Sequence, residues 1–224
     1  VNATGDDQPS QELVNAYPTI SGADVNTALS YQDQWAGRDD RFYATIVYNG
    51  ANYFGTQIWT YANGTIDGYG APNGTSTGYY SRKGIDTTLT APQGGASGTD
   101  FIALRYADIL LLSAEAANET GKTAEAYQAI EAVRARAGIR AGTGSLYGLA
   151  PGMNTGQMRK AIMRERFVEF AFEQIRFWDL LRWKQLSAVL NGKVRHGLLL
   201  TKNQGQPLSF HEALQHGDHQ PLII

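Results

Sequence analysis

Residues 162–183, which read IMRERFVEFAFEQIRFWDLLRW, carry the strongest helical pattern in the chain. Apolar side chains recur there every three or four residues, as they do on the inner stripe of an amphipathic helix. We therefore expect one helix over about 155–173 and another over about 177–190. The first stripe consists of Met163, Phe167, Phe170 and Ala171, and the core of the second helix consists of Leu180, Leu181 and Val189.

Three glutamates, Glu165, Glu169 and Glu173, lie four residues apart on one face of the first of these helices. Like charges at this spacing repel one another unless cations compensate them. One interpretation is a hydrolase or metal site, which together with Asp39 and Asp40 would suit glycoside cleavage. The other is an ion-pair network that ties helices together, and we favour it. Five residues are candidate partners: Arg105, Arg134, Arg136, Arg176 and Arg182.

The chain before this stretch predicts a helical hairpin. One helix over about 103–119 ends at Gly121, and a second begins with Thr123 as its N-cap and ends at Gly138. Small side chains at Ala114 and Ala126 would allow close contact, so the pair resembles one tetratricopeptide-type repeat. A single repeat cannot bury both of its faces, so the rest of the chain covers the open face or earlier repeats are missing.

The first 99 residues differ in composition from the helical part. Residues 42–80 hold seven of the 12 tyrosines, and Asn-Gly pairs such as Asn49-Gly50 mark turns among them. Aromatic and β-branched runs predict strands over 42–48 and 54–61. The fold class is therefore mainly α: a tetratricopeptide-like hairpin and two further helices, with a loop-rich aromatic segment that contains short strands. We divide the chain into this loop-rich segment (1–99), a helical core (100–191) and an irregular tail (192–224).

Aromatic and amide side chains gather in the loop-rich segment. Flat aromatic rings stack on the apolar faces of sugar rings, and amides or phenols pair with sugar hydroxyls. The same side chains would also suit a protein interface or a small core beneath long loops. We predict a ligand-binding surface that consists of Tyr48, Tyr53, Trp59, Tyr61, Asn63, Tyr69, Asn73, Tyr79 and Tyr80.

Composition excludes several other classes of protein. The 224 residues include 19 basic and 21 acidic side chains, so the chain lacks the basic surface that nucleic acid requires. Because it has no cysteine, disulfides, thiolate zinc sites and a cysteine nucleophile are excluded. Phosphate-binding and serine-hydrolase motifs are also absent, and we expect no cofactor and no catalytic residue. The tail residues His211, His216, Asp218 and His219 lack zinc-protease spacing, although a zinc site in a loop stays open; we predict no metal.

An ordered set of stretches points to one family. It comprises residues 9–17, 37–46, 48–50, 104–112, 114–116 and 133–138, and then residues 162–183. The last stretch contains the pattern Glu-Arg-x-x-Glu, from Glu165 to Glu169, followed by Arg-x-Trp-Asp-Leu-x-Arg-Trp, from Arg176 to Trp183. Together these stretches resemble the C-terminal part of the SusD/RagB family of outer-membrane nutrient-binding lipoproteins.

The resemblance implies a non-enzymatic protein that captures oligosaccharide or polysaccharide at the cell surface. Such a protein delivers its ligand to a SusC-like TonB-dependent outer-membrane transporter. The resemblance also implies earlier helical pairs and a lipid anchor on a cysteine, all upstream of Val1. The family's usual ending is not found after Asn191, so it lends the tail no support. Six residues carry over as structural: Arg105, Glu165, Arg166, Glu169, Asp179 and Arg182.

Two alternatives remain open at this point. The region could be a scaffold that contacts the transporter and has no ligand site of its own. It could also be a glycoside hydrolase that uses the glutamate ladder. Ligand contacts differ between family members, so the predicted ligand-binding residues rest on aromatic chemistry alone.

Overall fold

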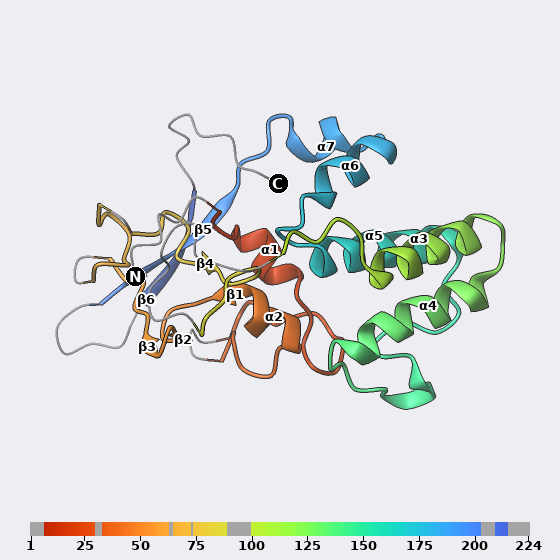
Figure 1. Cartoon of the computed structure of the whole chain (residues 1–224), viewed down its shortest axis with the longest axis horizontal. Coiled ribbons are helices and arrows are strands. Elements are labelled where there is room, and N and C mark those ends of the chain that lie inside the picture. Colours follow the sequence, from red (N-terminus) through yellow and green to blue (C-terminus); the bar gives the residue numbers. More distant parts are fainter. Residues whose placement is uncertain are drawn as a thin grey trace. The chain divides into compact units, whose positions relative to one another are not determined.

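The structure is a computed structural model that describes residues 7–29, 33–62, 65–72, 74–88 and 100–202, and the backbone of 209–214 (Figure 1). The chain forms two compact units, each assembled from separate stretches. We call Val1–Val14, Ala44–Phe101 and Phe177–Ile224 the loop-rich unit, and Asn15–Tyr43 with Ile102–Arg176 the helical unit. The predicted division at residues 99 and 191 stays a prediction. The mainly helical fold class is confirmed.

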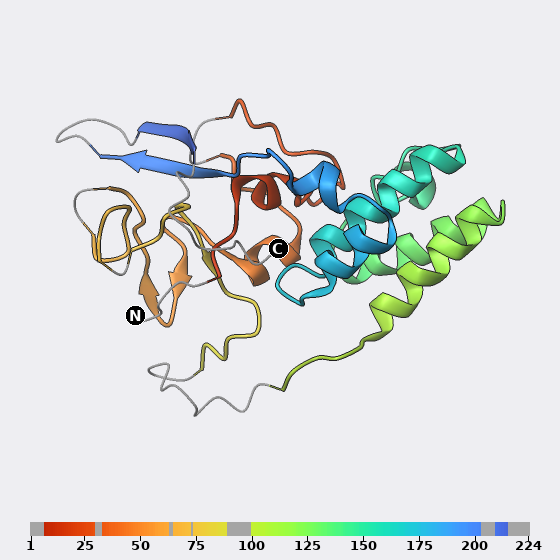
Figure 2. The same cartoon turned by 90° about the horizontal axis from the view of Figure 1, so that it is seen from above.

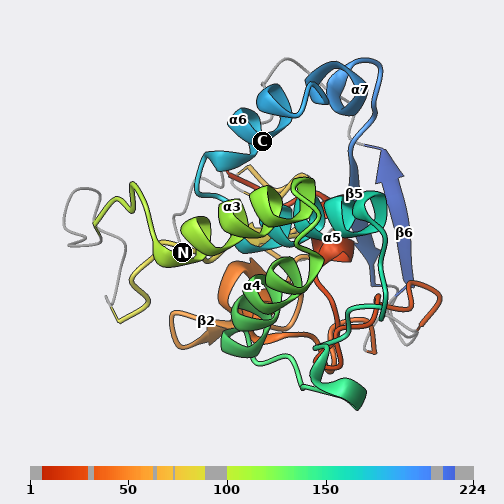
Figure 3. The ribbon, with the colours of Figure 1, turned by 90° about the vertical axis from the view of Figure 1, so that its right-hand side faces the viewer.

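Three helices build the helical unit: α3 (Tyr106–Glu119), α4 (Thr123–Arg136) and α5 (Thr155–Glu169). They pack against one another, as Figure 3 shows, and a short 3-10 turn, η1 (Thr143–Ser145), lies between α4 and α5 in the chain. Small side chains of α3 and α4 let these two helices approach closely, as predicted. The buried core consists of Leu111, Ala114, Ala117, Ala126, Ala129, Ile130, Val133, Leu149, Met158, Ile162 and Phe170.

Glycines end α3 and α4, as the sequence predicts. Gly121 and Gly138 have φ of 79° and 80°, a conformation that glycine adopts without a steric cost. Beyond α4, the N–H of Ile139 donates to the Arg134 carbonyl and the N–H of Gly138 to the Ala135 carbonyl, which is the Schellman pattern. The predicted N-cap of α4 is wrong by one residue, because Thr123 is already helical and Lys122 occupies the cap position.

The predicted ends of the later helices also need correction. Helix α5 begins at Thr155 as expected, behind a capping box of Asn154 and Gln157, but it ends at Glu169. The expected helix over 177–190 is two helices, α6 (Ile175–Arg182) and α7 (Leu186–Leu190). Lys184 separates them with φ of 57°, so a lysine takes the place that glycine usually has at a helix end. The sequence therefore gave no sign of this break.

The predicted strand over 42–48 is mostly a helix. After the first helix, α1 (Gln11–Ala16), residues Asp40–Thr45 form α2, and only Ile46–Val47 are extended as β1. The carboxylate of Asp39 accepts a hydrogen bond of 3.1 Å from the N–H of Phe42, so it caps the first turn of α2. This local cap outweighs the β preference of the aromatic residues that follow.

Short antiparallel strand pairs support the loop-rich unit. Strand β1 pairs with β4 (Tyr80–Ser81), and β2 (Asn52–Tyr53) pairs with β3 (Thr56–Gln57). The predicted strand over 54–61 is wrong for most of its length, because only Thr56–Gln57 form a strand and residues 58–61 belong to none. Phe54 and Gly55 both have positive φ and form the two-residue turn between β2 and β3. Their core consists of Val47, Ala51, Tyr53, Ile58 and Tyr80.

The expectation of an irregular tail is wrong for part of residues 192–224. Strand β5 (His196–Thr201) pairs antiparallel with β6 (Ser209–Leu214), and these are the two blue arrows in Figure 2. Within the loop-rich unit, the Glu12 carboxylate on α1 accepts hydrogen bonds from the N–H of His196 (3.1 Å) and contacts its ring Nδ1 (2.7 Å). The neighbouring strand β6 and the distant Glu12 side chain thus stabilise a segment whose sequence has no clear period.

Two loops of the helical unit touch at glycines. Gly22 and Gly148 have φ of 80° and 78°, and a Cβ on Gly148 would lie 2.5 Å from the Cα of Gly22. Such a distance is far inside van der Waals contact, so these two backbones can meet only without side chains.

We predict that Gly148→Ala lowers the melting temperature of the helical unit much more than Gly152→Ala. Both positions have positive φ, which costs an alanine about 1–2 kcal/mol. Only Gly148 adds a backbone clash, because nothing lies within 4 Å of a Cβ on Gly152. Thermal unfolding followed by circular dichroism measures both variants. Equal losses of stability would contradict the contact between the two loops.

Candidate functional site

Side chains alternate between buried and exposed positions along residues 58–62. Ile58, Thr60 and Ala62 are buried, whereas Trp59 is 38% exposed and Tyr61 is half-buried. A period of two is the pattern of an extended chain, in which every second side chain points to the same side. Trp59 and Tyr61 therefore point out of the loop-rich unit together.

Hydrogen bonds hold this segment in its extended form. The N–H of Thr60 donates to Oδ1 of the buried Asn49 side chain at 2.6 Å. The N–H of Ala62 donates to the Leu200 carbonyl of β5 at 2.8 Å. The two aromatic rings are thus carried by backbone that is fixed on both sides, so they need little reordering to bind a ligand.

Trp59 and Tyr61 form what we call the aromatic pair. Their ring centroids are 6.3 Å apart, and the ring planes are inclined by 54°. The ammonium group of Lys202 lies 5.2 Å from the centroid of Tyr61, which is within the range of a cation–π contact. The pair combines the exposed ring of Trp59 and the half-buried ring of Tyr61 with a donor group, and a saccharide needs both an aromatic ring and a donor from a binding surface.

Tyr69 lies on a loop that approaches the aromatic pair. A Cβ on the neighbouring Gly68 would be 2.1 Å from the Tyr61 carbonyl oxygen, so only glycine allows the loop to come this close. The Tyr69 side chain is 49% exposed. The structure therefore brings Trp59 and Tyr61 together, and Tyr69 is an exposed ring on the loop whose backbone lies against Tyr61.

Three other predicted ligand-binding residues have a different place. Tyr53, Tyr79 and Tyr80 are buried, with exposures of 4%, 0% and 7%. The Tyr79 hydroxyl donates to the Gln11 side chain at 2.9 Å, and the Tyr80 hydroxyl donates to the Asp67 carbonyl at 3.0 Å. Burial, aided by the nearby Asp67 charge, raises the pKa of Tyr80 to about 12.

These contacts correct the expectation for the three buried tyrosines. Their ring faces are covered, so they support the loop-rich unit from within. Tyr48 is half-buried against the core that contains Tyr53 and Tyr80, so at most the edge of its ring is available to a ligand. Asn63 and Asn73 lie outside the described residues, so their part in the surface stays a prediction.

The glutamate ladder of α5 is the centre of an ion-pair network in the helical unit. Glu165 is bound by Arg41 (2.6 Å) and Arg134 (2.8 Å), and its side chain is 2% exposed. Glu169 accepts from Arg41 at 2.9 Å and is also bound by Arg105 and Arg136. Arg105 reaches on to Glu173, and Arg41 to Asp39, at 2.8 and 2.7 Å. Four carboxylates therefore share four guanidinium groups.

The network holds its glutamates ionised in the interior. Burial alone would raise the pKa of Glu165, but the charges of Arg41 and Arg134 outweigh it, so the pKa lies below the ordinary value of 4.5. The pKa of Glu169 is lowered in the same way, chiefly by Arg41 and Arg105 against burial. At Asp39, which has Arg41 as its partner, burial prevails and the pKa is raised.

This network favours the structural interpretation of the ladder. A general acid needs a pKa raised towards neutrality, whereas the pKa values of Glu165 and Glu169 are lowered. Among the described residues, no group of three or more His, Asp or Glu side chains could hold a metal ion. Of the histidine cluster, His211 is described only by its backbone in β6, and His216, Asp218 and His219 lie outside the described residues.

The predicted cation partners are partly right. Arg105, Arg134 and Arg136 bind the ladder, whereas Arg176 stacks on Phe167 at 4.4 Å and Arg182 binds Asp179 at 2.9 Å. Sequence reasoning missed Arg41, which contacts three carboxylates. The signal was the adjacent sequence Asp39-Asp40-Arg41, but the two glutamate partners of Arg41 are more than 120 residues away in sequence.

Comparisons with known proteins agree on one family. The profile described as the SusD family matches residues 2–215. A curated relative from Formosa agariphila, SusD-like protein P2, is 38% identical over 99 residues, which are 43% of this chain and 19% of that protein. A second, SusD-like protein P38 from the same organism, is 33% identical over 93 residues, or 41% of this chain and 18% of that protein.

Solved structures give the same result for the fold. A SusD-like protein from Bacteroides fragilis superposes with a TM-score of 0.70 at 30% identity, over 87% of this chain and 39% of its own. A SusD-like carbohydrate-binding protein from the same organism has a TM-score of 0.68 at 24% identity. The match covers 84% of this chain and 37% of that protein. The chain thus spans about two fifths of these relatives' length.

We predict that Glu165→Gln destabilises the helical unit by about 3–5 kcal/mol, because it leaves buried guanidinium groups without their counter-charge. Urea unfolding measures this loss. The matched control is Glu119→Gln, which breaks the surface pair with Arg159, where both side chains are more than 40% exposed; little change is expected there. A Glu165→Gln variant as stable as the control would remove the support for the structural interpretation.

We predict that the helical unit loses stability as the pH falls below about 4.5. The pKa values of Glu165 and Glu169 are lower in the folded chain than the ordinary 4.5, so their contribution is complete above that pH and is lost as the pH falls through their folded values. The raised pKa of Asp39 makes the folded chain more stable as the pH falls, but it is one group, whereas Glu165 and Glu169 are two. Melting temperatures between pH 7 and pH 3 test this, and a Tm that rises on acidification would contradict it.

Proposed function

The chain belongs to the SusD family, and we propose on this basis that it binds carbohydrate and does not cleave it. One relative with the same fold is a carbohydrate-binding protein by its description. The observation that carries the proposal is the aromatic pair: two outward-facing rings, fixed by backbone hydrogen bonds, with a lysine ammonium beside them.

The chemistry of the aromatic pair suits a sugar chain. A pyranose ring has a face of C–H groups that packs on Trp59, while its hydroxyls accept hydrogen bonds from Lys202 or exchange them with the Tyr61 phenol. The rings are inclined by 54°, so they suit a glycan in which two successive sugar units are turned relative to each other. A flat, uniform polymer face would fit them less well. Tyr69 extends the surface by one further exposed ring.

Capture at the outer membrane is the finer part of the proposal. By its family, the whole protein would hold oligosaccharide or polysaccharide at the bacterial cell surface for a SusC-like TonB-dependent transporter. A lipid anchor on a cysteine upstream of Val1 would retain it there. Within the part of the chain that the structure describes, no helix is both long enough and apolar enough to cross a membrane.

The alternatives make different predictions. A pure scaffold would leave glycan binding unchanged when the aromatic pair is removed. A glycoside hydrolase would need two accessible carboxylates at a bond, whereas Glu165 and Glu169 are each 2% exposed and bound to guanidinium groups. The network thus favours binding over hydrolysis.

We predict that Trp59→Ala lowers glycan affinity about tenfold, or about 1.4 kcal/mol, because a stacking face is lost. Calorimetric titration with maltoheptaose, cellohexaose and laminarihexaose measures this, with Tyr61→Ala beside it. The control is Trp178→Ala, which removes another exposed tryptophan (64%) far along the chain and should leave binding unchanged. Binding that survives loss of both Trp59 and Tyr61 would favour the scaffold alternative, and release of shorter sugars would favour the hydrolase.

A further inference from the structure

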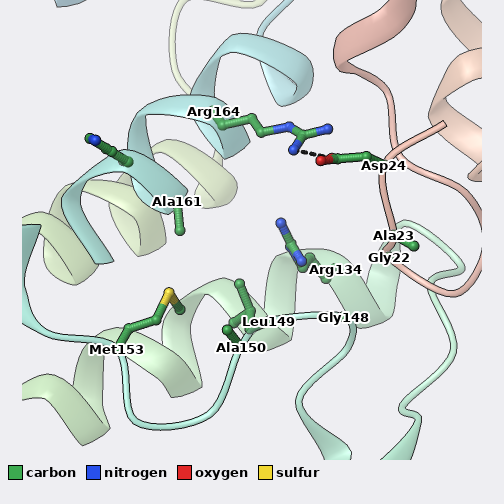
Figure 4. A pocket seen from close by; sticks show the side chains of 11 residues that line it. Gly22, Ala23, Asp24, Arg134, Gly148, Leu149, Ala150, Met153, Ala161 and Arg164 are labelled. Carbon is green, nitrogen blue, oxygen red and sulfur yellow. Dashed lines mark ion pairs between the residues drawn. The ribbon is translucent and has the colours of Figure 1, made fainter. Parts of the chain in front are cut away.

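The helical unit contains a cavity that the glycan proposal does not use. Its volume is about 410 Å³, which is within the range of small-molecule sites. Four segments line it: the loop 22–24, the end of α4 at Arg134, the segment 148–153 and the first half of α5 at residues 160–164. Figure 4 shows these side chains around one open space.

The two lining loops are locked together before any ligand arrives. Gly22 and Gly148 meet backbone to backbone, as described above, and the N–H of Arg140 donates to the Ile20 carbonyl at 2.8 Å. The cavity is therefore preformed in the structure, and a ligand would not have to order these loops.

One wall of the cavity is apolar. Leu149 is 7% exposed and belongs to the buried core, and Met153 and Ala161 pack against that core. Figure 4 shows Met153 and Leu149 on one side of the space and Ala161 above them. A ligand bound there would rest a small apolar body against this wall.

Cations face the apolar wall. The Arg134 side chain is 7% exposed; its Nε binds Glu165 at 2.8 Å and its Nη1 binds the Tyr147 carbonyl at 3.0 Å. A guanidinium group has five N–H donors, so these bonds leave part of the fork available, and Figure 4 shows it reaching into the space. A nearly buried guanidinium group is thus aimed into the cavity.

The rim carries two more cations and one acid. Arg164 binds the Asp24 carboxylate across the opening and the Ala16 carbonyl at 3.2 Å. Lys160, one turn before Arg164, is exposed and lines the same cavity. Asp24, the single carboxylate of the lining, is paired with Arg164, and Glu165, outside the lining, is paired with Arg134. The positive charge that remains at the cavity is therefore that of Lys160.

We propose that this cavity binds a small organic carboxylate, with its charged group at Arg134 and Lys160 and its body against Leu149 and Met153. A planar carboxylate fits the guanidinium fork, which a neutral molecule of the same size would leave unpaired. The apolar wall selects an organic anion over an inorganic one. The proposal is independent of the aromatic pair, so the failure of either leaves the other untouched.

The methionine methyl groups provide a direct test. The chain has three methionines, Met153, Met158 and Met163, so a methyl spectrum of protein labelled on methionine contains few signals. Met153 lines the cavity, Met158 is fully buried in the core, and Met163 is not part of the lining. The probes are cyclohexanecarboxylate, glucuronate and, as the neutral control, glucose.

We expect either acid to shift the Met153 signal in a saturable way, with Met158 and Met163 little changed, and glucose to shift none. Whichever acid binds more tightly then shows whether the cavity prefers a ligand with an apolar ring or one with a sugar ring. Lys160→Gln should weaken binding about tenfold, whereas Arg159→Gln, which removes the neighbouring charge outside the lining, should leave it unchanged. The proposal would be overturned if neither acid gave a saturable shift or if glucose gave an equal one. It would also be overturned if the two variants weakened binding equally.

Discussion

The guanidinium group of Arg41 is the contact on which the helical unit depends. Asp39, Glu165 and Glu169 share it, and all three carboxylates are at most 2% exposed. Removing an ionised carboxylate from water costs several kcal/mol, which is recovered only with close counter-charges and complete hydrogen bonding. The first turn of α2 and the inner face of α5 are therefore fixed to each other, and Arg134 and Arg136 add α4 to the same network.

This constraint separates the charged groups that stabilise the chain from the surface that we propose for binding. Glu165 and Glu169, the carboxylates that the hydrolase alternative would need, are buried and paired with guanidinium groups that link the helices. The exposed aromatic pair belongs to the loop-rich unit, where strand pairs and the Asn49 side chain position it. Stacking and hydrogen bonding to a sugar do not require a group of adjusted pKa, so the binding that we propose needs only a preformed surface.

Sequence predicted those features that depend on local periodicity or on an unambiguous glycine. The helices α3 and α4 with their ends at Gly121 and Gly138, and the start of α5 at Thr155, were predicted from the sequence. The break at Lys184 could not be predicted, because lysine is rarely left-handed. The pairing of β5 with β6 could not be predicted either, because residues 192–224 show no clear period. Composition predicted that the aromatic residues form one ligand-binding surface. It could not predict that Tyr79 is buried whereas Trp59 is exposed.

Amide hydrogen exchange of an Arg41→Gln variant tests the central role of this residue most directly. If three buried carboxylates depend on it, protection in α3, α4 and α5 falls together, because these helices lose stability as one cooperative unit. Protection in the strand pairs of the loop-rich unit then changes much less. Loss confined to residues 39–45, with α5 as protected as in the native chain, would contradict the account.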